Sequence, residues 1–121
     1  MLYYKELTGK ILGALVEVHE RLGPGHYEKT YQKASAHEFT LRGISFREQL
    51  PVRIKYKDII AKELKLDFLV EDKVIVELKA KKEINNIEKA QMLAYLKATG
   101  KKVGLLVNFG KRRIQIKRFV L

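Results

Sequence analysis

The spacing of the apolar residues changes from a helical period to a period of two after Gly43, and this change constrains the fold most. The first apolar series has the spacing of one helix face and comprises Leu7, Ile11, Leu15, Val18 and Leu22. The stretch Gly23-Pro24-Gly25 ends the series, so we predict a helix from about Tyr4 to Leu22. A second helical series runs from Tyr27 to Leu41 and ends at Gly43.

The period of two that follows predicts a three-stranded meander. Val52, Ile54 and Tyr56 alternate with basic residues before a turn near Lys57-Asp58. Apolar residues alternate again from Leu64 to Val70, and Glu71-Asp72-Lys73 makes the next turn. The run from Val74 to Leu78 is largely apolar, which is typical of a central strand.

A third helix and two strands complete the chain. Asn85 or Asn86 can cap a helix that reaches Thr99 and stops at Gly100. The segments from Val103 to Val107 and from Ile114 to Val120 then have the pattern of strands. The predicted order is ααβββαββ, an α/β or α+β fold in which helices flank one mixed sheet. We find no linker and no repeat, so residues 1–121 are expected to form one domain.

Charge and composition narrow the class of protein. The chain has 25 Lys and Arg against 14 Asp and Glu, and this net charge of +11 favours nucleic acid, DNA or RNA, as the partner. An anionic membrane surface is the alternative, but the basic residues are not gathered on one amphipathic helix. Apolar stretches such as Ile11 to Val16 are too short to span a bilayer, no signal peptide pattern precedes them, and cysteine is absent. We therefore expect a soluble, cytoplasmic protein.

Basic residues follow the central strand and fill the C-terminal end, where they could track phosphates: Lys81, Lys82, Lys101, Lys102, Lys111, Arg112, Arg113, Lys117 and Arg118. Another interpretation is a solvated sheet edge whose charges discourage strand addition. For Arg53, Lys55 and Lys57 we prefer that second interpretation.

Charged residues on the predicted central strand indicate a functional site. Alternation places Glu77 and Lys79 on the face opposite Val76. Burial of both charged groups costs several kcal/mol, an order-of-magnitude value, unless each has a partner or a metal. An exposed Glu-Lys pair is the simpler alternative.

Asp67 lies on the preceding strand, and its neighbours Leu66 and Phe68 are predicted to point to the opposite face. Asp67 faces Glu77 if the two antiparallel strands pair so that the numbers of any two opposed residues add up to an even value. A turn of three residues gives such a register. Two such carboxylates form an oxygen-rich cleft that suits Mg²⁺. Taken alone, Asp67 could instead cap a backbone group or pair with a lysine.

Gln91 and Tyr95 lie four residues apart on an otherwise apolar face of the third helix, so their side chains project the same way. A buried amide needs hydrogen-bond partners, and a phosphate, a base edge or a nearby acid would serve. A helix-edge glutamine beside a core tyrosine is the alternative.

Taken together, Asp67, Glu77-Leu78-Lys79 and the pair Gln91 and Tyr95 resemble the core motif of the PD-(D/E)XK nuclease superfamily, in its RecB-like variant with a Q-x-x-x-Y helix. The segment Gly25-His26-Tyr27-Glu28-Lys29-Thr30-Tyr31 is similar to the motif that names the GxxExxY protein family of that superfamily. The similarity covers nearly the whole chain and includes His19 and the stretch from Leu106 to Gly110. A leucine, Leu66, stands where a proline often precedes the metal-binding aspartate.

The resemblance implies a restriction-endonuclease-like core and a role for each matching residue. Asp67 and Glu77 would be metal ligands, Glu28 the helix-borne acid near the metal, and Lys79 the catalytic lysine. Gln91 and Tyr95 would support them. A lone helical histidine is more often packed than catalytic, so His19, His26 and His37 are left without an assigned role, although His19 fits the family pattern.

These observations lead to two hypotheses. The first is a nuclease that uses Mg²⁺ or Mn²⁺ to lower the pKa of a water and to neutralise the scissile phosphate, with Lys79 assisting that water. The second is a non-catalytic nucleic-acid-binding module that keeps the fold, although such a module has no need of two acids facing an anionic ligand. The oligomeric state stays open, with a homodimer as one option because a small nuclease commonly pairs to cut two strands.

Overall fold

The computed structural model describes residues 3–121, and its element order is the predicted ααβββαββ. Two helices come first, α1 (Lys5–Leu22) and α2 (Glu28–Leu41). Three strands follow, β1 (Phe46–Tyr56), β2 (Ile59–Val70) and β3 (Val74–Lys79). Helix α3 (Asn86–Thr99) then leads to β4 (Val103–Asn108) and β5 (Gln115–Val120). The predicted α/β fold with one mixed sheet is confirmed.

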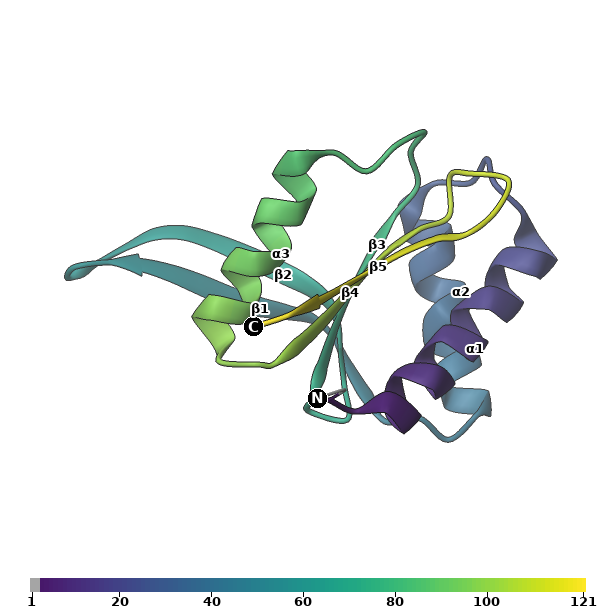
Figure 1. The fold of residues 1–121 in the computed structure, drawn as a ribbon, viewed down its shortest axis with the longest axis horizontal. Coiled ribbons are helices and arrows are strands. Elements are labelled where there is room, and N and C mark those ends of the chain that lie inside the picture. The colour runs from purple at the N-terminus through teal and green to yellow at the C-terminus, as the bar shows by residue number, and fades with distance from the viewer. Residues whose placement is uncertain (1–2) are drawn as a thin grey trace.

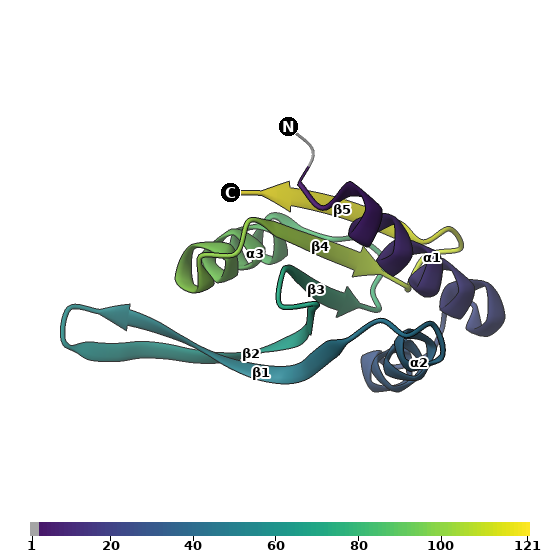
Figure 2. The same cartoon turned by 90° about the horizontal axis from the view of Figure 1, so that it is seen from below.

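The five strands form one sheet in the order β1-β2-β3-β4-β5. Only β3 and β4 run parallel, since α3 makes the crossover between them, and the other three pairs are antiparallel. Helices α1 and α2 cover one face of the sheet, and α3 covers the other (Figure 1, Figure 2). Each face therefore buries its own apolar cluster, as expected for a sheet between helical layers.

The predicted helix ends have clear physical causes. Gly23 and Gly100 end α1 and α3 with φ angles of 69° and 73°, in the left-handed region that glycine adopts without strain. Asn85 caps α3 by accepting hydrogen bonds from the backbone N–H groups of Ile87 and Glu88. The Glu88 side chain accepts a bond from the Asn85 backbone N–H in return, which completes a capping box.

Strands β1 and β2 are longer than their apolar alternation predicted. Alternation began at Val52 and Leu64, whereas the strands include residues 46–51 and 59–63 as well. Most of these added residues are exposed on both faces of the ribbon, so their side chains carry no burial pattern. The turns at Lys57-Asp58 and at Glu71-Asp72-Lys73 lie where the sequence predicted them.

The alternation of β2 breaks at Asp67. Phe68 packs in the cluster under α1 and α2, but Leu66 packs in the cluster under α3. The prediction that Leu66 and Phe68 share a face is therefore wrong. The break involves both strands: Gln49, which lies opposite Asp67, has a φ of 53°, and the β1–β2 ladder skips both residues while its register stays the same on either side.

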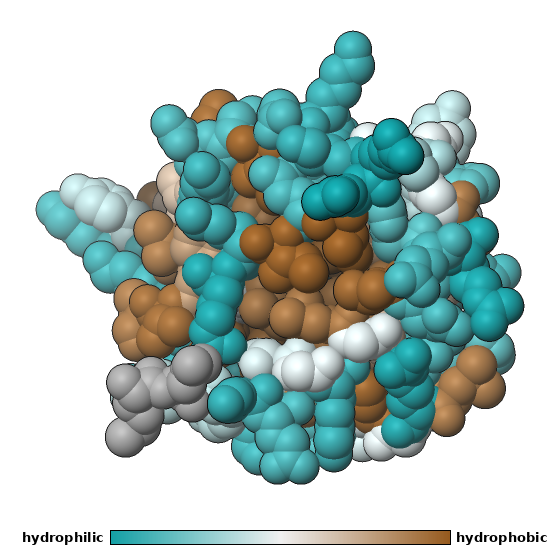
Figure 3. All heavy atoms as spheres, turned by 45° about the vertical axis from the view of Figure 1, so that its right-hand side comes forward, coloured by the Kyte–Doolittle hydropathy of each residue, from teal (hydrophilic) through white to brown (hydrophobic). Residues whose placement is uncertain are grey.

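The surface and the helices hold two further features. Much of the face on the side of α1 and α2 is hydrophilic, with apolar surface gathered near its centre (Figure 3). Within residues 3–121, no helix is long and apolar enough to cross a membrane.

Candidate active site

Asp67 and Glu77 meet at the point where β2 and β3 separate. The ladder between these strands ends at the pair Phe68 and Val76, and its register places Asp67 opposite Glu77, as the sequence predicted. The Asp67 backbone N–H donates to Glu77 Oε1 at 3.3 Å, and the Leu78 N–H donates to Asp67 Oδ2 at 2.7 Å. Each carboxyl group thus accepts a hydrogen bond from the opposite strand, which holds the two acids together.

The Glu77 carboxyl group is buried, with 5% of the residue exposed. Burial, then the charge of Asp67 and a hydrogen bond with its side chain, together raise the pKa of Glu77 to about 10, against smaller opposing contributions from the Asp67 N–H and Lys79. Two carboxylates this close repel each other unless a proton or a cation lies between them. The pair is therefore suited to hold a positive species.

The side chain of Gln32 holds the Asp67 backbone and is itself held by Glu48. The Asp67 carbonyl group accepts a hydrogen bond from Gln32 Nε2 at 3.1 Å, and the same amide donates to Glu48 Oε1 at 3.3 Å. Gln32 lies on α2, so this helix fixes Asp67 at the break in the ladder. The sequence analysis did not identify Gln32, because an exposed-looking glutamine on a helix has no distinguishing pattern before the strands are placed.

Glu28 is the first residue of α2 and is exposed. It lines a pocket of about 190 Å³ beside Asp67, and the other lining residues are Lys29, Gln32, Gln49 and Leu78. Within residues 3–121, however, no three His, Asp or Glu side chains come close enough together to hold a metal ion. Glu28 thus shares a pocket with Asp67 but does not join the acid pair as a third ligand.

Lys79 is the last residue of β3 and is half-buried. Its positive charge lowers the pKa of Glu77 and also that of Glu88, so it lies within electrostatic reach of both acids. For Glu88, burial acts in the opposite direction, and hydrogen bonds from Asn85 and Lys81 favour the ionised form. The Lys81 ammonium lies 3.0 Å from Glu88 Oε1, so this second basic group is already paired with an acid.

Asn108 holds the chain that follows Lys79, and the sequence analysis did not assign it this role. Its buried amide accepts from the Lys81 N–H at 3.1 Å and the Gly110 N–H at 3.0 Å, and it donates to the Lys81 carbonyl at 2.8 Å. A Cβ on Gly110 would lie 2.3 Å from the Lys81 nitrogen, so only glycine permits this approach. Asn108 and Gly110 therefore clamp the exit of β3.

Tyr95 projects from α3 toward the acid pair. The ring packs with Leu66 and Ile75, and the residue is 3% exposed. Burial raises the pKa of Tyr95, and the negative charges of Glu77 and then Asp67 raise it further, which places the phenol near both acids. Gln91 lies one turn earlier on α3 and is half-buried, and its amide makes no hydrogen bond within residues 3–121.

The stretch from Gly25 to Tyr31 shapes the entry to α2. Gly25 has a φ of 105°, which favours glycine. The buried Tyr31 donates its hydroxyl to the Gly23 carbonyl, and its ring stacks on Phe109 with centroids 4.5 Å apart. These contacts anchor the loop and leave Glu28 exposed beside the acid pair.

The three histidines lie outside the acid pair. His19 is buried and donates from Nε2 to the Lys111 carbonyl at 2.8 Å, so it ties α1 to the connection between β4 and β5. His26 bonds the Leu22 carbonyl through its ring, and His37 is exposed on α2.

The chemistry of the acid pair fits a hard divalent cation. Mg²⁺ binds through one or two carboxylates and keeps several waters, so it does not require three protein ligands. Asp67 and Glu77 supply two carboxylates whose mutual repulsion a cation would relieve. The residues present thus fit such an ion.

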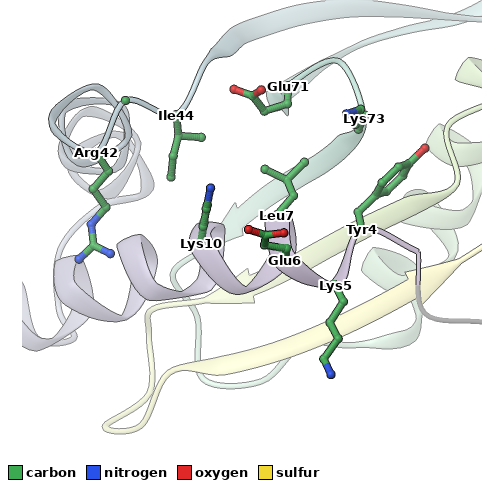
Figure 4. A pocket seen from close by; sticks show the side chains of 10 residues that line it. Tyr4, Lys5, Glu6, Leu7, Lys10, Arg42, Ile44, Glu71 and Lys73 are labelled. Carbon is green, nitrogen blue, oxygen red and sulfur yellow. The ribbon is translucent and has the colours of Figure 1, made fainter.

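A second, larger pocket contains none of the predicted site residues. It has a volume of about 790 Å³ and lies between the first turns of α1, the α2–β1 connection and the β2–β3 turn (Figure 4). Several of its charged groups already have partners, since Glu71 accepts from the Ser45 N–H and Arg42 pairs with Glu38. We therefore place the candidate reaction at the acid pair and not in this pocket.

Comparison with known proteins identifies the superfamily and the fold of the chain. A sequence profile described as the PD-(D/E)XK nuclease superfamily matches residues 5–119. Among solved structures, the chain is similar to an alkaline exonuclease, LHK-Exo, from Laribacter hongkongensis, with a TM-score of 0.56 and 14% identity over 99% of this chain and 72% of that chain. No curated protein matches the chain. The structural likeness shows a nuclease-like fold, and the profile covers nearly the whole sequence: the chain belongs to the PD-(D/E)XK nuclease superfamily.

Proposed function

We propose that this protein is a nuclease that hydrolyses phosphodiester bonds of DNA or RNA with the help of Mg²⁺ or Mn²⁺. The observation that carries the proposal is the Asp67–Glu77 pair, in which a buried carboxyl group faces a second one across two strands, beside the half-buried Lys79. Superfamily membership supports the reaction class. We further assign the chain to the GxxExxY family and the RecB-like variant, on the motif from Gly25 to Tyr31 and on Gln91 with Tyr95.

Each residue has a defined part in the proposed reaction. Asp67 and Glu77 would hold the metal ion, which when bound lowers the pKa of a water and neutralises charge on the phosphate. Lys79 would orient the attacking water or stabilise the charge that develops on the phosphate oxygens. Residues 1–121 would act as a single nuclease domain.

The remaining assigned residues would support the acid pair. Glu28 would reach the metal through a water, because its carboxyl lines the same pocket as Asp67 without joining the pair. The buried Tyr95 would support the acid pair from α3, and the half-buried Gln91 would offer its amide to the substrate.

The assay that tests this function is cleavage of labelled single-stranded and double-stranded DNA and RNA in Mg²⁺, in Mn²⁺ and in EDTA. We expect cleavage that requires the divalent ion and that Asp67→Asn abolishes. Asp72→Asn is the matched control. It makes the same chemical change outside the acid pair, in the exposed β2–β3 turn. The same assay with dimer and monomer fractions from size exclusion tests whether a homodimer is the active form.

The alternative is a non-catalytic nucleic-acid-binding module, and one observation favours it. Within residues 3–121, no third acid or histidine completes a preformed metal site. Calcium binding followed by calorimetry separates the two functions, because a binding module would take up no divalent ion at Asp67 and Glu77. If the wild-type protein cleaves no substrate and also binds no calcium, the binding module would be the correct function and the nuclease hypothesis would be wrong.

A further inference from the structure

Strands β1 and β2 continue well beyond the rest of the sheet as a two-stranded ribbon (Figure 1, Figure 2). Strand β3 pairs with β2 only from Phe68 to Val70, whereas the β1–β2 pairing continues outward to Tyr56 and Ile59. We call residues 51–65 the arm. All residues from Lys55 to Glu63 are exposed, so the outer arm contributes little to either apolar cluster.

The arm carries a positive charge that is mostly unpaired. It has five basic and two acidic side chains, a net charge of +3. Arg53 pairs with Glu63 across the ribbon at 3.6 Å. Within residues 3–121, no ion pair involves the four lysines of the arm, which are Lys55, Lys57, Lys62 and Lys65.

The tip of the arm is apolar. Tyr56, Ile59 and Ile60 flank the Lys57-Asp58 turn and are 61%, 57% and 50% exposed. Tyr56 and Ile59 pair across the ribbon and so share one face, and contiguous exposed apolar surface is a feature of binding sites.

Protection of a sheet edge could account for the lysines of β1, but it does not account for the apolar tip. Lysines on β1 do discourage strand addition, which was the interpretation preferred from the sequence. Exposed isoleucines and a tyrosine have the opposite effect, since they promote association. A two-stranded ribbon alone is also only marginally stable in water, so a long one is not explained by its contribution to the fold.

We propose that the arm binds in a groove of double-stranded DNA, with its lysines on the phosphates and its tip against the bases. The inference rests on the proposed nuclease function, because it names the substrate class for the same site. A two-stranded β-ribbon fits the major groove of B-form DNA, whereas the deep, narrow major groove of A-form RNA excludes it. The four unpaired lysines complement the phosphate charge on both sides of that groove.

Geometry connects the arm to the acid pair. Asp67 and the turn residue Asp58 belong to one continuous stretch of β2 and its turn. Nine residues of strand span about 30 Å, which is close to one helical turn of B-form DNA at about 34 Å. A duplex cut at Asp67 and Glu77 would therefore be held about one turn away by the tip.

The test measures binding in EDTA, where no cleavage occurs. The arm variant is Lys55→Gln/Lys57→Gln/Lys62→Gln, and the matched control is Lys5→Gln/Lys10→Gln/Lys33→Gln, which removes the same charge from exposed positions on α1 and α2. We expect the arm variant to bind a 30-base-pair DNA duplex about 10- to 100-fold more weakly. The slope of log Kd against log salt should fall by about two to three, since each lost phosphate contact removes roughly 0.9. The control should change the slope by less than about one.

A second variant separates the tip from the charge. Ile59→Thr/Ile60→Thr keeps strand propensity and removes apolar surface. It should weaken duplex binding by about tenfold with an unchanged salt slope, because transfer of apolar surface from water is not electrostatic. Circular dichroism and thermal melting of each variant check that the fold is retained.

Several results would overturn the proposal. Equal losses in the arm variant and the control would show that affinity depends on overall charge only. A larger loss on single-stranded DNA or on duplex RNA than on duplex DNA would assign another substrate class. A change from dimer to monomer in light scattering, with duplex binding intact, would assign the arm to a second copy of the chain. Because binding is read without metal, a wild-type protein that never cleaves DNA refutes the nuclease function but still allows the arm to be tested.

Discussion

At the scale of single residues, two acids lie opposite each other on neighbouring strands of the sheet. Asp67 interrupts the ladder and takes a backbone hydrogen bond from β3, and Glu77 takes one from β2. Neither carboxyl group contributes to the apolar core, and the burial of Glu77 beside Asp67 opposes folding when no cation is present. A buried pair that opposes folding is typical of a functional site, where stability is commonly traded for activity.

The first prediction concerns Glu77→Gln in EDTA. At pH 7 the folded Glu77 holds a proton because its pKa is raised to about 10, whereas the unfolded chain releases it near 4.5. Folding then costs free energy that increases as the pH rises from 4.5 toward 10, and a neutral glutamine removes that cost. We expect the free energy of unfolding at pH 7 to rise by about 1–3 kcal/mol, measured by urea denaturation.

The exposed Glu83→Gln is the control for this measurement and should leave stability nearly unchanged. In Mg²⁺ the wild-type protein should be more stable than Glu77→Gln, because only the wild-type protein gains stability from a bound ion. A loss of stability by Glu77→Gln in EDTA would show instead that Glu77 is ionised and supported by Lys79.

The second prediction concerns Lys79→Ala. The rate of cleavage should fall about a hundredfold or more, because a charge that acts in the transition state is lost. Duplex binding should stay within about threefold, since one lysine adds little to a net charge of +11. Lys73→Ala, in the turn just before β3, is the matched control for single-turnover kinetics. An unchanged rate in Lys79→Ala would move the reaction to another centre.

At the scale of elements, the end of β3 depends on β4. Strands β3 and β4 pair in parallel with Lys79 opposite Asn108, and the Phe109 N–H donates to the Lys79 carbonyl at 2.8 Å. Asn108 then bonds both backbone groups of Lys81. The position of Lys79 is thus set by residues about thirty positions later in the chain.

The third prediction tests this clamp with Asn108→Ala. The Lys81 backbone groups would lose their buried partner, which should lower the free energy of unfolding by about 1–3 kcal/mol. At saturating substrate and a temperature where the variant is folded, kcat should fall about tenfold or more with KM nearly unchanged, because Lys79 loses its position but the binding surfaces remain. Asn86→Ala, an exposed change on α3, is the control. A change in KM alone would refute the positioning role.

At the scale of the whole molecule, charge of one sign dominates. The net charge is +11, and exposed ion pairs contribute only about 0–1 kcal/mol each, so they compensate little of the repulsion among the basic groups. Like charges across the surface repel and oppose the compact state.

The fourth prediction is that added salt stabilises the protein. Raising NaCl from about 20 to 300 mM shortens the Debye length to below about 10 Å and screens this repulsion, so Tm should rise by about 2–5 °C in a thermal melt. Glucose at equal osmolality is the control for nonspecific effects. A fall in Tm would mean that the ion pairs contribute more than the repulsion removes.

Most of the fold followed from local patterns, because helix spacing, strand alternation and glycine stops are properties of neighbouring residues. Helix α1 begins one residue from its predicted start, and both turns of the meander lie where they were placed. The lengths of β1 and β2 did not follow, since their outer residues are exposed on both faces and carry no burial pattern. The face of Leu66 was predicted wrongly because the alternation breaks where Gln49 and Asp67 lie opposite each other, and this irregularity has no signal in the local sequence of β2.

The sequence by itself determined the order of the elements, the register that sets Asp67 opposite Glu77, and the residue types available for chemistry. Only the tertiary structure decided which residues surround this chemistry. Gln32 bonds the Asp67 carbonyl, Asn108 bonds the chain just after β3, and Glu28 shares the pocket of Asp67 but lies apart from the acid pair. The physical reason is the separation along the chain over which each kind of interaction acts. Periodicity and capping act within a few residues, whereas these contacts join side chains brought together only when the helices pack on the completed sheet.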